Sequence, residues 1–420
     1  MALSSLAPED LAVFAAEQRA AYDALVARGL KLDLTRGKPS SAQLDLSDAL
    51  LALPTGHLAA DGTDVRNYGG LTGLPELRAI FAELLGVRVE QLVAGGNASL
   101  TMMADVLQYC LLHGAVDSQT PWAAGDVTFI CPVPGYDRHF DLLAEYGITM
   151  VIVPMHEDGP DVPAIRELVK DPTVKGMWIV PTYANPGGAV CSQEVAAELV
   201  AMQTAAPDFK IFWDNAYAFH HLTDEETKSA DILSLAEASG HPHRPIVFAS
   251  TSKITYAGAG VAFVGGSTAT IDWYTGHLGK RAIGPDKVNH LRHAQLFGDA
   301  EGVRTHMRKH REIIAPKFAA VDTALRSRLG GHDVAVWNTP SGGYFVNLDV
   351  LDGTASRVVQ LAKEAGIALT PAGSSFPHGD DPRDRNIRLA PTMPPLHEVE
   401  IAMDGVATCV LVAACEQLGA

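Results

Sequence analysis

The chain has 420 residues, of which 47% are hydrophobic and 19% charged, and its formal net charge is −17. The chain is acidic and has no Lys- or Arg-rich run that could neutralise phosphates, so we do not expect it to bind nucleic acid. Its length is too great for one small core, so we expect two or three domains.

Cysteine usage and apolar patterning indicate the compartment. The five cysteines are scattered and form no CxxC pair, which is typical of reduced thiols. The first 30 residues contain four acidic side chains and no basic start followed by an apolar segment, so we expect no secretory signal. No apolar stretch reaches the roughly 18 residues that a membrane helix needs. We therefore predict a cytoplasmic protein that does not bind a membrane.

Residues 8–29 are predicted to form an amphipathic helix, with an acidic first turn and a stop at Gly29. From about Gln91, helical patterns alternate with short apolar runs. The helical patterns cover residues 98–112, 137–146, 161–170 and 192–205, and the apolar runs cover 127–130, 148–153, 177–180, 211–213, 246–249 and 261–264. Apolar runs that do not alternate with polar residues are typical of strands covered on both faces, as in a mainly parallel α/β sheet.

This alternation fades after about residue 270. A long helical stretch is expected over residues 286–329, followed by a strand pair near 342–348 and 387–390 and a closing helix from about 396. We expect the N-terminal segment to join this part, because residues 32–39 form a loop that leads out of an isolated helix. The sequence thus predicts a large α/β domain (residues 46–285) and a smaller α+β domain (residues 1–45 and 286–420).

Lys253 is the most informative residue, because it follows an apolar strand and lies among hydroxyl and small side chains. A lone amine in this place suits covalent bonding to a phosphorylated aldehyde, whose phosphate the neighbouring hydroxyls and loop amides would hold. A solvated surface lysine is the alternative interpretation of this segment alone.

Other segments follow strands at the edge where an open α/β sheet binds its ligand. Residues 94–99 precede a helix whose N-terminus suits a phosphate, although an ordinary turn and cap has the same pattern. Tyr136 either stacks on a flat ring or caps its Pro-rich loop. Asn185 lies in an Asn-Pro-Gly-Gly turn and could donate to a ring oxygen.

Asp214 ends a strongly apolar strand, where a carboxylate is costly to desolvate without a cation. A protonated pyridine nitrogen is one such partner, and a buried Arg or His is the other. Tyr217 lies three residues further on and could reach an oxygen on the same ring.

Taken in order, Gly-Gly-Asn-Ala-Ser, Pro-Gly-Tyr, Asn-Pro-Gly-Gly, Asp-x-x-Tyr, Ser-x-x-Lys and a late Ile-Arg-Leu resemble the fold-type I pyridoxal-phosphate (PLP) aminotransferases, the aspartate aminotransferase superfamily. The resemblance covers nearly the whole chain. It implies a three-layer large domain with a mainly parallel sheet, a smaller α+β domain and PLP as cofactor, and no metal site is expected.

The resemblance also implies roles for single residues. Lys253 would be the Schiff-base lysine and the base that moves a proton, and Asp214 would pair with the ring nitrogen. The remaining ring contacts would be His139 orienting Asp214, Asn185 and Tyr217 on the phenolate oxygen, and Tyr136 stacked on the ring.

Phosphate and substrate contacts follow from the same resemblance. Asn97, Ala98, Ser99, Ser250 and Ser252 would hold the phosphate, together with Tyr68 of a neighbouring subunit, which implies a homodimer with shared active sites. The substrate contacts that the resemblance implies would be Arg388 on the α-carboxylate, with Gly37 and Asn185 beside it. A dicarboxylic substrate also needs a second cation, and Arg138, two residues past Tyr136, is the first candidate, with Arg36 and Arg281 as further candidates. A solvated arginine at a helix N-terminus is the alternative interpretation of Arg138.

The chain departs from the common pattern after Lys253, where residues 256–263 lack the arginine that pairs with the phosphate in many relatives. Arg36 and Lys280 are both candidates for a replacement. This departure resembles the actinobacterial-type aspartate aminotransferases, often grouped as MocR-like aminotransferases. The regulators of that name carry a DNA-binding domain, which we do not expect because the segment before residue 91 matches aminotransferase elements.

The predicted function is a ping-pong exchange of an amino group between an L-amino acid, aspartate or glutamate first, and a 2-oxo acid such as 2-oxoglutarate. An aromatic or kynurenine-type aminotransferase and a carbon–sulfur lyase are alternatives on the same fold. A non-catalytic PLP sensor is an alternative of another class, which the complete set of catalytic candidates argues against.

Overall fold

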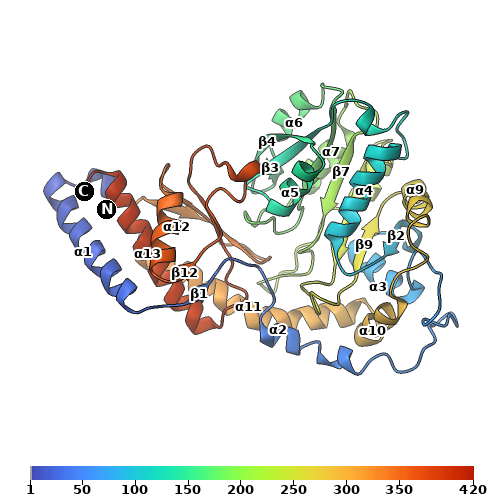
Figure 1. Cartoon of the computed structure of the whole chain (residues 1–420), viewed down its shortest axis with the longest axis horizontal. Helices are drawn as coiled ribbons and strands as arrows, with labels where there is room; N and C mark the ends of the chain where they lie inside the picture. The colour runs from blue at the N-terminus through green and yellow to red at the C-terminus, as the bar shows by residue number, and fades with distance from the viewer. Residues whose placement is uncertain (1) are drawn as a thin grey trace.

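The computed structural model describes residues 2–420, and its main body is an eight-stranded sheet with the order β2–β9–β8–β7–β6–β3–β4–β5 (Figure 1). Its strands are β2 (Leu92–Ala94), β3 (Thr128–Val133), β4 (Thr149–His156), β5 (Gly159–Pro160), β6 (Val174–Ile179), β7 (Lys210–Asp214), β8 (Pro245–Ser250) and β9 (Ala262–Gly265). The five strands from β8 to β4 in this order are mutually parallel, whereas β9 and β5 run antiparallel to their neighbours. The predicted α/β fold with a mainly parallel sheet is thus confirmed.

Both faces of this sheet are covered by helices, because successive residues of one strand join different cores. Phe212 packs in a cluster with α4, α5 and α9, whereas its neighbours Ile211 and Trp213 pack with α6, α7 and α8. The bounds of these helices are α4 (Ser99–His113), α5 (Asp137–Glu145), α6 (Val162–Leu168), α7 (Gln193–Ala201), α8 (Ile232–Ala238) and α9 (Thr268–Leu278). Double coverage explains why the strands are apolar throughout instead of alternating.

The other part of the molecule carries two small sheets and the chain termini (Figure 1). An antiparallel sheet contains β10 (Ala335–Trp337), β11 (Val346–Val350) and β13 (Asn386–Leu389), and a parallel pair contains β1 (Leu32–Asp33) and β12 (Ile367–Ala368). The helices α1 (Pro8–Ala27), α12 (Ala355–Glu364) and α13 (Leu396–Gln417) pack in one apolar cluster with these sheets. The strand pair β11–β13 was predicted, whereas β10 and β1 were not. The predicted domain boundaries stay a prediction.

The predicted helical stretch over residues 286–329 is two helices, α10 (Lys287–Phe297) and α11 (Ala300–Leu329). The chain breaks at Gly298, which has a φ of +73°, and Asp299 then caps α11 by accepting from Gly302 N at 2.8 Å. Val303 of α11 packs with the large sheet, whereas Val321 packs with the small sheets. One helix therefore connects both cores.

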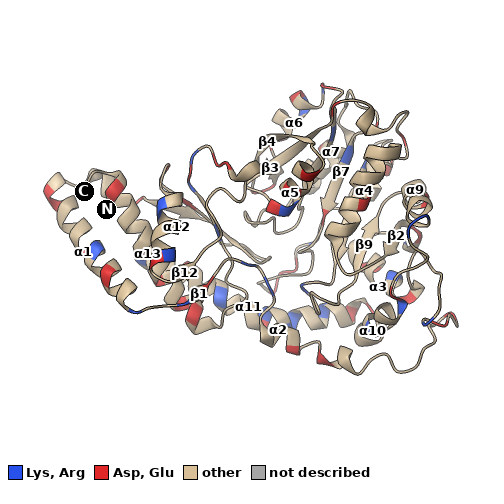
Figure 2. Ribbon diagram, in the orientation of Figure 1, with Lys and Arg blue, Asp and Glu red and all other residues tan. Residues whose placement is uncertain are grey.

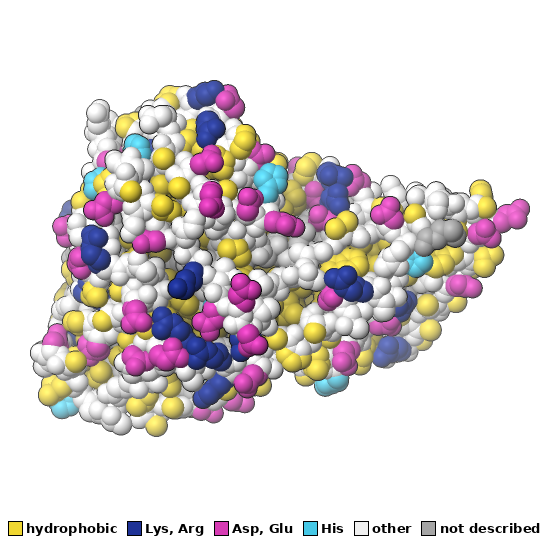
Figure 3. Space-filling view, turned by 180° about the vertical axis from the view of Figure 1, so that it is seen from behind, with side chains coloured by type: hydrophobic (Ala, Val, Ile, Leu, Met, Phe, Trp, Pro, Cys, Tyr) yellow, Lys and Arg dark blue, Asp and Glu magenta, His cyan; other side chains and the backbone are white. Residues whose placement is uncertain are grey.

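The remaining elements are α2 (Ser41–Asp45), α3 (Pro75–Leu85) and five 3₁₀ turns, at Leu3–Ser5, Asp48–Leu51, Val89–Gln91, Trp122–Ala124 and Pro377–Gly379. Basic and acidic residues are interspersed along the ribbon (Figure 2), and their side chains are interspersed over the rear face (Figure 3). Within residues 2–420, no helix combines the length and apolar character needed to cross a bilayer.

Candidate active site

The predicted site residues follow four neighbouring parallel strands of the large sheet. Asp214 ends β7, Lys253 follows β8, Asn185 follows β6 and Tyr136 follows β3. Because the carboxyl ends of parallel strands share one edge, these side chains converge there. A small cluster that includes Tyr217 of this part and residues 344–345 beside β11 joins this edge to the other core. The site therefore lies where the two parts of the molecule meet.

Asp214 is held by His139, which belongs to a helix that covers the sheet. The carboxylate is buried, and its Oδ2 lies 3.0 Å from Nε2 of His139 in the first turn of α5. The His139 ring in turn stacks on Trp178 of β6, with centroids 4.2 Å apart and planes at 10°. The other oxygen, Oδ1, is buried and has no partner in the described part of the chain. One oxygen is thus fixed, and the second is available to accept from a ligand donor.

Lys253 lies beside the ring of Tyr217, with Nζ 4.8 Å from the ring centroid. Burial lowers the pKa of Lys253 from its usual value, while the negative charge of Asp214 opposes this shift. Burial also raises the pKa of Tyr217 well above its usual value. The amine is therefore more readily neutral than an exposed lysine, and the Tyr217 hydroxyl keeps its proton as a donor.

Asn185 and Arg388 lie beside each other. Nδ2 of Asn185 is buried and has no partner among residues 2–420, and Oδ1 of Asn185 lies 3.5 Å from Nη1 of Arg388. Arg388 belongs to β13, is buried, and has its Cζ 5.1 Å from the ring centroid of Phe345. A Cβ at position 37 would overlap the same ring, which explains why a glycine stands there. The backbone of Gly37 thus lies close to the Phe345 ring that Arg388 contacts.

Asp137 is a residue of the site that was not predicted from the sequence. Its carboxylate pairs with the guanidinium group of Arg388. Oδ1 of Asp137 lies 3.1 Å from Nη1, and Oδ2 lies 3.4 Å from Nη2. In the sequence, Asp137 is only an acidic residue in the first turn of a helix, a place that favours carboxylates generally. Its proximity to Tyr136 was the one available signal.

The segment predicted to hold phosphate lies at the N-terminus of α4. Ala98 is the N-cap residue and makes no side-chain cap, so the first N–H groups of the helix are available to an anion. Ser252 Oγ donates to Asn97 O at 3.2 Å and ties this loop to the Lys253 loop. Ser99 begins the helix, and Ser250 ends β8 nearby.

Four basic residues that were predicted as candidate contacts of the phosphate or the substrate are paired with other residues or exposed to solvent. Arg138 is more than half exposed and pairs with Asp141 one turn along α5, at 3.3 Å. Arg281 pairs with Asp105 and donates to the hydroxyl of Tyr109 at 3.1 Å. The side chains of Arg36 and Lys280 are exposed. In this conformation, none of the four has a described contact with Lys253 or Arg388.

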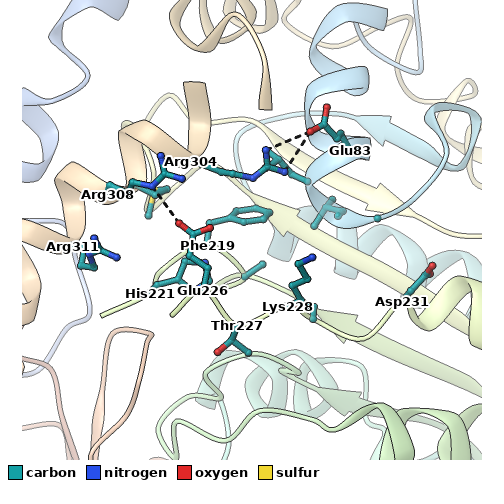
Figure 4. A pocket seen from close by; sticks show the side chains of 16 residues that line it. Glu83, Phe219, His221, Glu226, Thr227, Lys228, Asp231, Arg304, Arg308 and Arg311 are labelled. Carbon is teal, nitrogen blue, oxygen red and sulfur yellow. Dashed lines mark hydrogen bonds and ion pairs between the residues drawn. The ribbon is translucent and has the colours of Figure 1, made fainter. Parts of the chain in front are cut away.

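A cavity of about 290 Å³ lies between α11 and the loop that follows β7 (Figure 4). None of the predicted cofactor residues lines it. Its arginines are already paired, Arg304 with Glu83 and Arg308 with Glu226. The converging groups at the sheet edge therefore remain the candidate active site.

Comparison with known proteins decides the family. The family model described as aspartate amino-transferase matches residues 6–420. The chain belongs to the aspartate aminotransferase family. It is an aminotransferase, and membership of this family implies PLP as cofactor.

Individual relatives agree with this assignment. The chain is 57% identical to the aspartate aminotransferase of Corynebacterium glutamicum, over 99% of this chain and 97% of the relative. A solved aspartate transaminase from that organism superposes with a TM-score of 0.98 at 56% identity, covering 100% of both chains. At 20% identity, the α-aminoadipate aminotransferase of Thermus thermophilus, complexed with N-(5'-phosphopyridoxyl)-L-leucine, shares the fold with a TM-score of 0.73, over 94% of this chain and 95% of its own.

The pairing of Asp137 with Arg388 generates a prediction for this family member. A ligand carboxylate must displace Asp137 before it can take both guanidinium nitrogens, so Asp137→Asn should lower the Kd of 2-oxoglutarate by about three- to ten-fold. Titration calorimetry on the holoenzyme measures this. Glu145→Gln, an exposed carboxylate at the end of the same helix, should leave the Kd unchanged. An unchanged or higher Kd for Asp137→Asn would show that Asp137 does not compete with the ligand.

Proposed function

We propose that the protein transfers the amino group of aspartate or glutamate to a 2-oxo acid such as 2-oxoglutarate in a ping-pong cycle with PLP. The observation that carries this proposal is the pair formed by Lys253, with its lowered pKa, and the buried, half-satisfied carboxylate of Asp214. The aspartate aminotransferase name of a relative at 57% identity supports the substrate class. We further propose a cytoplasmic location, because all five cysteines are free and buried.

The unpartnered buried atoms at the sheet edge fit a pyridoxal ring. Oδ1 of Asp214 would accept from the protonated ring nitrogen, which is the cation that a buried carboxylate needs. Nδ2 of Asn185 and the hydroxyl of Tyr217 would donate to the phenolate oxygen. Tyr136, edge-on to His139 with centroids 4.9 Å apart, would stack on the ring. Donor and acceptor types thus match the ring at each position.

The phosphate would lie at the N-terminus of α4, where helix N–H groups and the positive dipole end stabilise an anion. Ala98 and Ser99 would supply backbone N–H groups, and the side chains of Asn97, Ser250 and Ser252 would complete the site. In this arrangement, amide and hydroxyl groups hold the phosphate in place of the arginine that many relatives have after the lysine.

When bound, PLP supplies an electron sink for the bonds at the substrate Cα. The Lys253 amine would hold the cofactor, and as a free amine it would accept the proton from the substrate Cα and return it. Asp214, oriented by His139, would keep the ring nitrogen protonated. Arg388 would hold the α-carboxylate through two parallel hydrogen bonds after Asp137 releases it.

A homodimer with shared sites is part of the proposal. Tyr68 is 83% exposed, and the nearby chain segment also exposes Leu51 and Leu58. Large exposed apolar side chains in one segment favour a protein interface. Lys287 fixes this loop by donating to Asn67 O at 2.7 Å and Gly69 O at 2.5 Å. Tyr68 would therefore be held in place to reach the phosphate of a partner subunit.

Removal of the Lys253 amine tests the proposed chemistry directly. Lys253→Ala should abolish the pH-sensitive visible absorbance of the PLP-loaded enzyme and lower kcat by several orders of magnitude, because nucleophile and base are lost together. Absorbance titration and steady-state kinetics measure both. Lys228→Ala, an exposed lysine at the cavity of Figure 4, should behave like the wild type. A retained pH-sensitive band would place the reactive amine elsewhere.

Arg138 is the first candidate for the side-chain carboxylate of a dicarboxylic substrate. If it turns from Asp141 toward the substrate, Arg138→Ala should raise the KM for aspartate at least about ten-fold and leave the KM for alanine nearly unchanged. Arg36→Ala provides the parallel measurement for the next candidate. An equal effect of Arg138→Ala on both amino acids would remove it from the specificity role.

A further inference from the structure

The turn that carries Lys253 is held through its backbone by donors from distant segments. The carbonyl oxygen of Lys253 accepts from the hydroxyl of Tyr344 at 3.2 Å and faces Nε2 of His220 at 3.3 Å. The next carbonyl, of Ile254, accepts from Nε2 of His306 at 2.8 Å. Two successive peptide groups at the reactive lysine are thus fixed from outside the turn.

Gln43 of α2 contacts Tyr344, one of these donors. The hydrogen bond that Gln43 forms in its own helix cap fixes the orientation of its amide group. Gln43 is fully buried, and its Oε1 accepts from the backbone N–H of Ser40 at 3.0 Å. The other end of the amide is therefore the NH₂ group. It donates to Nδ1 of His310 at 3.1 Å and to the hydroxyl of Tyr344 at 2.9 Å.

These two bonds decide where both partners direct their protons. Because Nδ1 of His310 accepts, the proton of its neutral ring lies on Nε2, which is 3.2 Å from Nε2 of His306. Because the Tyr344 hydroxyl accepts from Gln43, its own proton is free to bond Lys253 O. Burial lowers the pKa of His310 to about 3, so this ring is neutral at physiological pH.

We infer that Gln43 is a positioning residue for Lys253: by donating to the Tyr344 hydroxyl, it directs the proton of that hydroxyl onto the backbone carbonyl of Lys253. The inference rests on the proposed function, in which the Lys253 amine carries the proton at Cα. Proton transfer between two carbons requires close alignment, and a misplacement of about 1 Å can cost about 100-fold in rate. Gln43 lies 210 residues away in the chain, so only the fold makes this connection.

Gln43→Glu tests the inference with almost no change of shape. A carboxylate still accepts from Ser40 but no longer donates, so the Tyr344 hydroxyl would turn toward the new carboxylate and leave Lys253 O. In the PLP-loaded enzyme we expect kcat to fall by about 10- to 100-fold while KM changes less than about two-fold. The pH midpoint of the visible absorbance should shift by about half a unit or more, because the amine has moved relative to Asp214.

Gln91→Glu is the matched control. Gln91 is also buried and forms the same kind of cap, accepting from Arg88 N at 3.0 Å, but it has no described contact with the Lys253 turn. It should lose thermal stability at most and keep the wild-type kcat and absorbance midpoint. A Gln43→Glu enzyme that keeps both values as well would overturn the inference.

Tyr344→Phe provides the second variant if Gln43→Glu does not fold, since it removes only the hydroxyl that connects Gln43 to Lys253 O. It should lower kcat at least about three-fold with KM unchanged and move the absorbance midpoint. A wild-type kcat and midpoint in this variant would also overturn the inference. A wild-type protein without any visible absorbance after PLP addition would instead contradict the proposed function.

Discussion

The hydrogen bond between Asp214 and His139 is the interaction on which the rest of the site depends. A carboxylate at the end of a fully buried strand costs several kcal/mol to desolvate unless its oxygens are satisfied. His139 satisfies one oxygen at 3.0 Å, and the stack on Trp178 prevents the imidazole from turning away. The second oxygen has no partner among the residues that the structure describes. One buried carboxylate oxygen is thus available to accept a hydrogen bond from a ligand.

The fold places complementary groups around that charge. Lys253, Asn185 and Tyr136 follow strands that are parallel to β7, so sheet topology alone brings them to one edge. Arg388 comes from the small antiparallel sheet, and α11 packs against both cores. A change in the angle between the two parts of the molecule would therefore alter the distance from Arg388 to Lys253, which in the proposed function is the distance that a bound amino acid would span.

The strand ends could be predicted from the sequence because each joins a wholly apolar run to a polar or small residue. Lys253 and Asp214 were visible in this way, as was the fold class. Contacts between distant segments could not be predicted: Asp137 lies 251 residues from Arg388, and Gln43 lies 267 from His310. The break between α10 and α11 was missed because Gly298 lies within an otherwise helical pattern and only its positive φ reveals the cap. Arg281 had the right charge, but its neighbour in the fold, Asp105, binds it.

In the proposed function, Asp214 keeps the ring nitrogen of PLP protonated. Nitrogen-15 NMR of the enzyme loaded with PLP labelled at that nitrogen measures the protonation state directly. We expect the resonance of a protonated pyridine nitrogen at neutral pH in the wild type, and its loss in Asp214→Ala. A resonance of unprotonated pyridine in the wild-type enzyme at neutral pH would show that Asp214 does not have this role.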